Sequence, residues 1–167
     1  MSFSVYDVVA SLARPLNNLD AIVSKAEEFA KEKEIDPDVL IQARLRPDML
    51  PFVAQIRIAT DIAKGAVARL SGSDPEKWAD DETTFEDIHT RLRKGIDVVS
   101  SIGPAQFEGA EDRDIVLNIR GSEMRFKGRD YLLGFVIPNV YFHVTTAYDI
   151  LRFNGLDIGK MDFIGAP

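Results

Sequence analysis

The sequence predicts an all-α protein, a four-helix bundle with one small β-hairpin inserted before its last helix. Three observations support this fold class. Apolar residues recur at spacings of three and four in four long segments, as the buried face of a helix requires. Glycine and proline residues separate these segments. A single stretch, residues 114–127, is instead rich in β-prone residues on both sides of a Gly-Ser pair.

Length and composition suit one domain over residues 1–167. The chain has 20 Lys and Arg residues against 27 Asp and Glu residues, a net charge of −7, and 46% of its residues are hydrophobic. Nucleic acid is not an expected partner, because phosphate binding needs clustered cations. The absence of cysteine excludes disulfides, thiol catalysis and Cys-ligated metals.

Neither a membrane partner nor secretion is indicated by the sequence. No stretch approaches the ~20 apolar residues that cross a bilayer. The N-terminus has no basic region before a long apolar run, as a signal peptide would. We therefore expect a cytoplasmic protein.

The first long helix is expected to start near Leu16, because Pro15 interrupts the apolar run around it. Its buried positions continue at steps of three and four as far as Ala30. A short helical turn should follow over residues 36–43. The Asp-Pro pair at its start provides a cap and a first-turn proline.

The second long helix is expected to begin near Pro47 or Pro51 and to end at Leu70, where a Ser-Gly-Ser-Asp-Pro sequence terminates it. Alanines occupy much of its buried stripe. Their small side chains should let a neighbouring helix approach closely.

The third long helix is expected over about residues 84–101, and an acidic segment leads into it. We interpret residues 74–87 as a solvated loop that ends in the capping box Thr83-x-x-Glu86, because acidic residues favour the positive end of a helix dipole. A calcium loop is the alternative, but the EF-hand spacing of acidic residues is absent.

The hairpin strands are expected at residues 114–120 and 123–127, around the turn Gly121-Ser122. An isolated hairpin is only marginally stable, so this one should pack on the helices.

The last long helix is expected over residues 130–153, with an interruption at Pro138. The tail over residues 156–167 is apolar enough to dock on the bundle. These elements complete the predicted bundle.

The last helix carries the most informative polar residues. Spacings of three and four place Asn139, His143 and Thr146 on one face, beside the apolar stripe. Such a band can line a pocket between helices, where bundles place their sites. On the second helix, Gln55 lies near the buried edge and can hydrogen-bond His143. The alternative, a buried histidine satisfied by its neighbours, stays open.

Two further polar positions lie on the second and third long helices. His89 lies about 60° from the centre of the apolar stripe of the third helix, so it is either a boundary residue or a pocket candidate. Asp61 is expected on the surface, paired with Lys64 or Arg57.

Only a limited chemistry can be assigned to these side chains. His143 can act as a general base or a hydrogen-bond donor, because an imidazole has a pKa of ~6.5, and Asn139 can orient a ligand. Zinc or iron would need three or more converging ligands, and His143 is the single candidate. The catalytic residues and the substrate stay open.

Several stretches resemble a bacterial and fungal domain-of-unknown-function family that is grouped with the DinB/YfiT-like bundles. The resemblance covers nearly the whole chain, and its C-terminal block is the most specific part. The stretches that carry it are Ala43–Leu50, Gln55–Gly65, Pro138–Arg152, Asn154-Gly155 and Gly159-Lys160-x-Asp162.

The resemblance implies a DinB-like, up-down-down-up four-helix bundle that is often dimeric, within a superfamily of candidate metalloenzymes. Metal-binding members use a histidine on the second helix and an H-x-x-x-H pair on the last. Here His143 matches the second histidine of the pair and Asn139 stands at the first. Ile62 stands where closer relatives have histidine. At most one of three ligands is therefore retained for a divalent transition metal.

Three functional hypotheses follow. The first is a bundle that binds a small molecule in an interhelical pocket around His143. The second is a non-catalytic homodimerisation or interaction module, indicated by the missing ligands and the alanine-rich helix faces. The third is a metal-dependent transferase or hydrolase that acts on small molecules. Whether the protein is an enzyme stays open.

Overall fold

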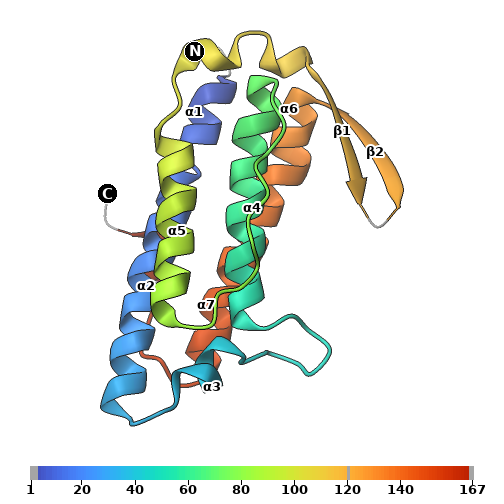
Figure 1. Ribbon diagram of the computed structural model, residues 1–167. Helices are drawn as coiled ribbons and strands as arrows, with labels where there is room; N and C mark the ends of the chain where they lie inside the picture. The colour runs from blue at the N-terminus through green and yellow to red at the C-terminus, as the bar shows by residue number, and fades with distance from the viewer. Residues whose placement is uncertain (1–3, 120, 166–167) are drawn as a thin grey trace.

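Four long helices form the body of the protein in the computed structural model, which describes residues 4–119 and 121–165. They pack side by side in a ring in which α4 contacts α5 and α7, and α2 contacts the same two helices (Figure 1). Because a long strap joins α4 to α5, these two helices run in the same direction. The predicted all-α, up-down-down-up bundle is confirmed. The long helices are α2 (Ala13–Glu32), α4 (Phe52–Ser71), α5 (Phe85–Ser100) and α7 (Ile137–Phe153).

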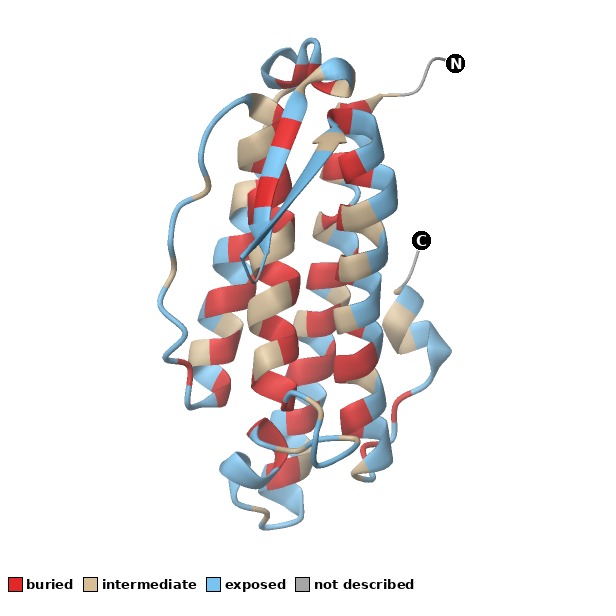
Figure 2. Ribbon diagram, turned by 90° about the vertical axis from the view of Figure 1, so that its right-hand side faces the viewer, coloured by how far each residue is buried: buried red, intermediate tan, exposed pale blue. Residues whose placement is uncertain are grey.

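The core lies along the bundle axis, where each long helix turns its apolar stripe inward (Figure 2). The stripe of α4 includes Ala59, Ala63 and Ala66, all fully buried. At Gly95 of α5, an added Cβ atom would lie 3.1 Å from Cγ2 of Thr60 on α4. Small residues on both helices thus permit the close approach that the sequence predicted.

The first helical run breaks earlier than expected. Helix α1 (Val5–Ala10) ends before Ser11, and α2 begins at Ala13 with Pro15 inside its first turn. Proline is tolerated there because first-turn N–H groups need no helical partner. The short α3 (Pro37–Ile41) begins as predicted, with the Asp36 side chain accepting from the backbone of Asp38 at 3.0 Å.

The capping box of α5 is shifted by one residue from the predicted one. Oγ1 of Thr84 accepts from the Asp87 backbone N–H at 3.1 Å, and Oδ2 of Asp87 accepts from the Thr84 N–H at 2.9 Å. The box over Thr83 and Glu86 was therefore wrong. The helix begins at Phe85, whose burial in the core fixes the register. At the end of α4, Gly72 adopts the left-handed cap at φ 85°.

The hairpin consists of β1 (Asp114–Ile119) and β2 (Ser122–Lys127) and follows two short 3₁₀ turns, η1 (Pro104–Phe107) and η2 (Ala110–Asp112). The strands are antiparallel, and the last pair joins Ile119 to Ser122. Ser122 therefore belongs to β2 and not to the turn, so the predicted turn Gly121-Ser122 was wrong at Ser122. The last residue of the predicted first strand, residue 120, lies outside the described residues.

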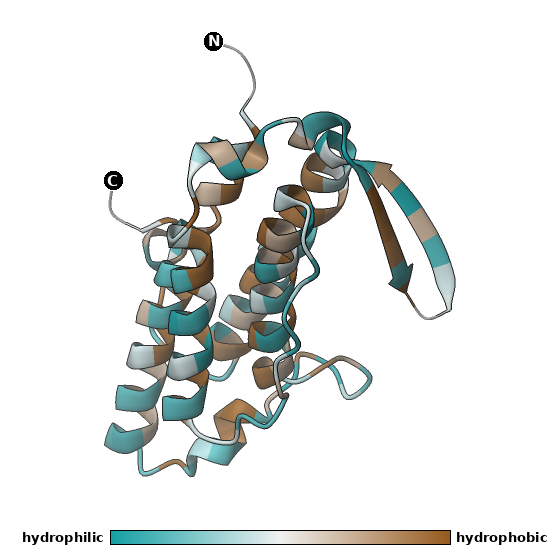
Figure 3. Cartoon of the chain, turned by 45° about the horizontal axis from the view of Figure 1, so that its top comes forward, coloured by the Kyte–Doolittle hydropathy of each residue, from teal (hydrophilic) through white to brown (hydrophobic). Residues whose placement is uncertain are grey.

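The hairpin packs on the bundle only near its base. β1 is largely hydrophobic (Figure 3), and its Ile115 and Leu117 are buried. Phe126 of β2 contacts the rings of Tyr131 and Phe135. The predicted packing of the hairpin on the helices is confirmed at these residues.

The expected interruption at Pro138 takes the form of a π-helical turn. Helix α6 (Gly128–Tyr131) leads into the π turn η3 (Leu132–Val136), and α7 then begins at Ile137 with Pro138 in its first turn. Proline has no N–H and its ring clashes with the carbonyl four residues back, so a wider turn before it relieves both problems.

The tail docks as predicted, over the described part of residues 156–167. Leu156 and Ile158 are buried. Helix α8 (Lys160–Ile164) packs against α2, where Nζ of Lys25 lies 2.6 Å from Oδ1 of Asp162. In the described part of the chain, no helix combines the length and apolarity that crossing a bilayer would need.

Candidate functional site

His143 and Gln55 meet across the seam between α7 and α4. Nδ1 of His143 lies 2.7 Å from Oε1 of Gln55, and Nε2 of Gln55 donates to the backbone carbonyl of Leu50 at 3.0 Å. Gln55 is 2% exposed, while His143 is half-buried. The contact that the sequence analysis considered between these two side chains is present.

This hydrogen-bond chain fixes the tautomer of His143. The Leu50 carbonyl can only accept, so the amide group of Gln55 faces it and the carbonyl of Gln55 faces the imidazole. Nδ1 of His143 must then donate. A neutral imidazole with its proton on Nδ1 has a lone pair on Nε2.

Nε2 of His143 is open to solvent. It has no hydrogen-bond partner among the described residues. Every fully buried side-chain nitrogen or oxygen of those residues has a partner, so Nε2 must reach solvent. Burial of the rest of the ring lowers the pKa of His143 below the usual value, because desolvation disfavours the charged form. The neutral tautomer is thus favoured at neutral pH.

Two other members of the predicted polar band do not join His143. Nδ2 of Asn139 donates to the Phe135 carbonyl at 2.7 Å, and Oγ1 of Thr146 donates to the Phe142 carbonyl at 2.7 Å. Both bonds lie within the helix and its preceding π turn. Of the three side chains of the band, only His143 therefore bonds a residue of another helix, and the other two bond backbone carbonyls nearby in the sequence.

His89 lies on a different seam. Its Nδ1 is 2.6 Å from Oδ1 of Asp20 on α2, and its Nε2 is 3.7 Å from Oε2 of Glu27 on the same helix. It therefore connects α5 to α2, while His143 connects α7 to α4. The structure does not bring the two histidines together.

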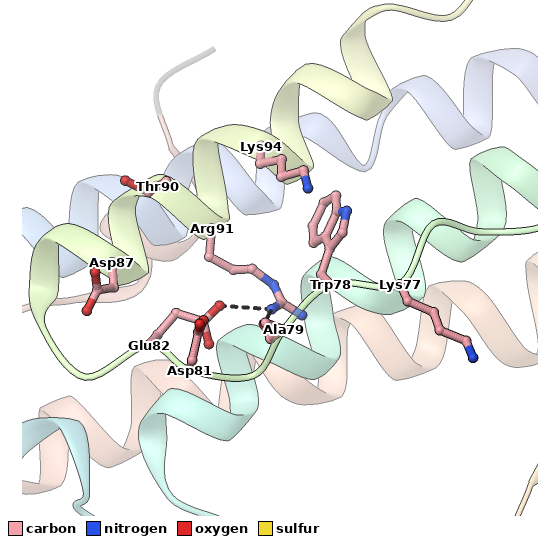
Figure 4. Close-up of a pocket in the computed structure, with 9 residues that line it drawn as sticks. All are labelled: Lys77, Trp78, Ala79, Asp81, Glu82, Asp87, Thr90, Arg91 and Lys94. Atoms are coloured by element: carbon pink, nitrogen blue, oxygen red, sulfur yellow. Dashed lines mark hydrogen bonds and ion pairs between the residues drawn. The ribbon is translucent and has the colours of Figure 1, made fainter.

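The strap between α4 and α5 contains a cluster that the sequence analysis missed. Arg91 of α5, whose side chain is 3% exposed, donates to Oε1 of Glu82 at 2.8 Å (Figure 4). It also donates to Oδ1 of Asp61 at 2.9 Å. Nε of Arg57 donates to Oε2 of Glu82 at 2.6 Å. Glu82 is therefore buried and paired, although the acidic segment was interpreted as a solvated loop.

Trp78 completes this cluster. The ammonium groups of Lys64 and Lys94 lie 4.2 and 4.4 Å from its ring centre, and the guanidinium of Arg91 lies 5.1 Å from it. A cavity of about 280 Å³ beside the ring is lined by both cations and carboxylates. Arg91 bonds Ala79 and Glu82 of the strap and Thr60 and Asp61 of α4, so the cluster fastens the strap to the bundle.

Asp61 pairs with Lys64 at 2.8 Å, one of the two alternatives that the sequence analysis gave. It also pairs with Arg91 at 2.9 Å, which the sequence analysis did not predict. The one available signal was the position of Arg91 three residues after Ile88, on the apolar side of α5. An arginine there needs a buried carboxylate.

The donor set does not fit a three-ligand metal centre. Asn139 bonds its own helix, and the residue of α4 that faces His143 is Gln55, whose carbonyl oxygen already accepts from the imidazole. Ile62 lies two helical turns further along. Over residues 4–119 and 121–165, no group of three or more His, Asp or Glu side chains is placed to hold a metal ion.

The fold and sequence match known proteins over nearly the whole chain. The profile of the family described as "Domain of unknown function (DUF1993)" matches residues 5–164. The chain belongs to this family. The DUF1993 chain is also similar to the crystal structure of a DinB family member protein from Shewanella denitrificans. Their TM-score is 0.91 at 39% identity, over 97% of this chain and 92% of that one.

This similarity establishes a DinB-like domain-of-unknown-function protein. A comparison with curated proteins finds no match. The helical bundle with a hairpin before its last helix is shared with the Shewanella protein at the level of the fold.

Proposed function

We propose that this DUF1993 protein binds a small molecule at the His143–Gln55 pair, with Nε2 of His143 as the acceptor. The observation that carries the proposal is the hydrogen-bond chain from the Leu50 carbonyl through Gln55 to Nδ1 of His143. Because this chain places the proton on Nδ1, the lone pair on Nε2 is available to a hydroxyl or amine of the ligand.

Two exposed apolar side chains next to the His143–Gln55 pair indicate the rest of the ligand. The ring of Phe142 meets the His143 ring edge-on, with centroids 5.2 Å apart, and is 59% exposed. Leu50, at the other end of the hydrogen-bond chain, is 50% exposed. A molecule with an apolar body and one hydrogen-bond donor would cover both side chains and reach the imidazole.

The proposed site lies at the surface of the seam between α4 and α7. Five cavities of the described chain have volumes between about 220 and 640 Å³, and none of these five is lined by His143 or Gln55. The proposed site is therefore a surface site at the seam, where ligand binding covers exposed apolar side chains.

A fragment screen tests this proposal. A library of small apolar alcohols and amines is titrated into the protein while NMR follows the Cε1–H signals of both histidines. We expect saturable shifts at His143, and their loss in His143→Gln. His89→Gln is the matched control, because it removes the other imidazole and should leave binding unchanged. If no fragment shifts His143, or if both variants lose binding equally, the proposal is wrong.

A homodimer is the second candidate, and the exposed apolar surface of the last helical run favours it. Leu133 and Tyr141 are each 41% exposed, and Phe142 is 59% exposed. Large apolar side chains that stay exposed can be covered by a partner. Light scattering after size-exclusion chromatography should give the mass of a dimer, and Phe142→Ser should shift it towards the monomer. A monomeric wild-type protein would contradict this candidate.

A further inference from the structure

A groove between the C-terminal end of α4 and β1 contains two arginines, Arg69 and Arg113. Its volume is about 540 Å³, and its walls include Arg69, Ser73, Asp74 and Arg113. Both arginines are half-buried. Neither forms an ion pair within the described part of the chain, where the bonds of both side chains go to neutral acceptors.

Those neutral acceptors leave the positive charges in place. Nη1 of Arg69 donates to the hydroxyl of Tyr131 at 3.2 Å, and burial raises the pKa of Tyr131, so the hydroxyl is an uncharged phenol. Arg113 donates to the backbone carbonyls of Leu70 and Glu108. A guanidinium has five N–H donors, and Arg69 uses one of them and Arg113 two within the described part of the chain.

The other two arginines that are not exposed in the described part of the chain are arranged differently. Arg57 and Arg91 are also largely buried, and both are paired with the carboxylate of Glu82. The chain has 27 Asp and Glu residues, so carboxylates are plentiful. At the groove, carboxylates are not placed against the arginines.

The acidic residues of the groove do not cancel its charge. Asp114 is paired with Lys127, whose Nζ lies 2.6 Å from Oδ1 of the carboxylate. Asp74 is exposed and is the one other carboxylate of the groove wall. Two guanidinium groups against one exposed carboxylate leave the groove positive within a chain whose net charge is −7.

The two guanidinium groups are held apart along α4. Arg69 folds over Gly65, and Arg113 lies over Gly72, where a Cβ atom would be 3.3 Å from Cζ of Arg113. These glycines are two helical turns apart, about 10 Å at 1.5 Å per residue. A ligand that contacts both arginines must therefore be elongated.

We propose that this groove binds a small organic anion whose carboxylate or phosphate oxygens reach both arginines. The planar fork of each guanidinium matches such oxyanions with two parallel hydrogen bonds. The groove lies about 20 Å along α4 from Gln55, so this site is separate from the one at His143.

NMR titration of the intact protein tests the ligand class. The probes are adipate and 4-phosphonobutyrate, which are charged at both ends, with hexanoate and inorganic phosphate as single-ended controls. We expect saturable shifts of the Arg69 and Arg113 Nε–H signals, with the two-ended anions binding about tenfold more tightly than the single-ended ones. The tighter of the two-ended probes identifies carboxylate or phosphate as the preferred chemistry. Equal affinity for hexanoate and adipate, or no saturation, would overturn the proposal.

Three variants test whether binding depends on this groove, and not on the net charge or on the stability of the protein. Arg69→Gln should weaken binding of adipate about tenfold. Arg125→Gln is the matched control, because it removes the same charge from an exposed position of β2 and should leave the affinity unchanged. Asp74→Asn should tighten binding, a result that unfolding cannot produce. Equal weakening in Arg69→Gln and Arg125→Gln would contradict the site.

Discussion

Arg91 is the buried charge on which the attachment of the strap depends. Replacing it with alanine should lower the free energy of unfolding by about 3–5 kcal/mol, because Glu82 would remain buried with one of its two cations missing. Chemical denaturation measures the change. Arg93→Ala is the control, since Arg93 is exposed in its pair with Glu86 and should change stability by less than about 1 kcal/mol. Equal losses in both variants would contradict this role.

The pH dependence of stability should report on His143. Burial lowers its pKa in the folded protein, so below the unfolded pKa of ~6.5 the unfolded chain binds more protons than the folded one. The contribution of His143 to stability is therefore complete above that pH and is lost as the pH falls towards the folded pKa. Urea denaturation at several pH values should show a smaller acid loss in His143→Gln than in the wild type. An identical pH profile would contradict the lowered pKa.

The local chemistry of single residues was partly predictable. The periodicity of α7 correctly placed His143 at a seam where Gln55 can reach it. Spacing could not show that Asn139 and Thr146 would bond their own helix, because a side chain on the right face can still turn back to a backbone carbonyl. The burial of Glu82 was equally hidden, since it depends on an arginine from another element.

At the scale of elements, the start of α6 depends on a glycine. A Cβ atom at Gly128 would collide with the backbone carbonyl of Ala110 in η2, which packs against α6. Gly128→Ala should therefore lower the free energy of unfolding by about 1–3 kcal/mol. Gly134→Ala is the control, because nothing lies within 4 Å of its added Cβ atom, and it should be neutral or stabilising. Thermal unfolding of both variants checks this, and equal stability of the two would contradict it.

Element types were predictable where periodicity was strong, and boundaries were set by packing. Pro15 and Pro138 were recognised as breakpoints, but each was accommodated within the first turn of a helix rather than between two helices. The capping box moved to Thr84 because burial of Phe85 fixes the register of α5. Such one-residue shifts follow from contacts between elements that are distant in sequence.

At the scale of the whole molecule, the ring of four helices and the docked tail were predictable, because apolar stripes and terminators are local signals. The position of each helix relative to its neighbours along the bundle axis was not predictable. Position 62 was compared with a family histidine, but the α4 residue opposite His143 is Gln55. Which turns of two helices meet is decided by their relative shift along the bundle axis.

The side chains that could ligate a metal predict how much metal the protein binds. With one imidazole at the α4–α7 seam, we expect less than about a tenth of an equivalent of zinc, nickel or manganese after incubation and desalting, since a site with three good ligands should fill readily. Elemental analysis measures the content, and His143→Gln should give the same value. One equivalent that is lost in His143→Gln would contradict the account.

The tautomer of His143 is the most direct test of the account. ¹⁵N-labelled protein at neutral pH should show His143 with its proton on Nδ1 and an unprotonated Nε2, and Gln55→Leu should shift the ring towards the Nε2–H form that free histidine prefers. A wild-type His143 that carries its proton on Nε2 would contradict the hydrogen-bond chain and the binding site built on it.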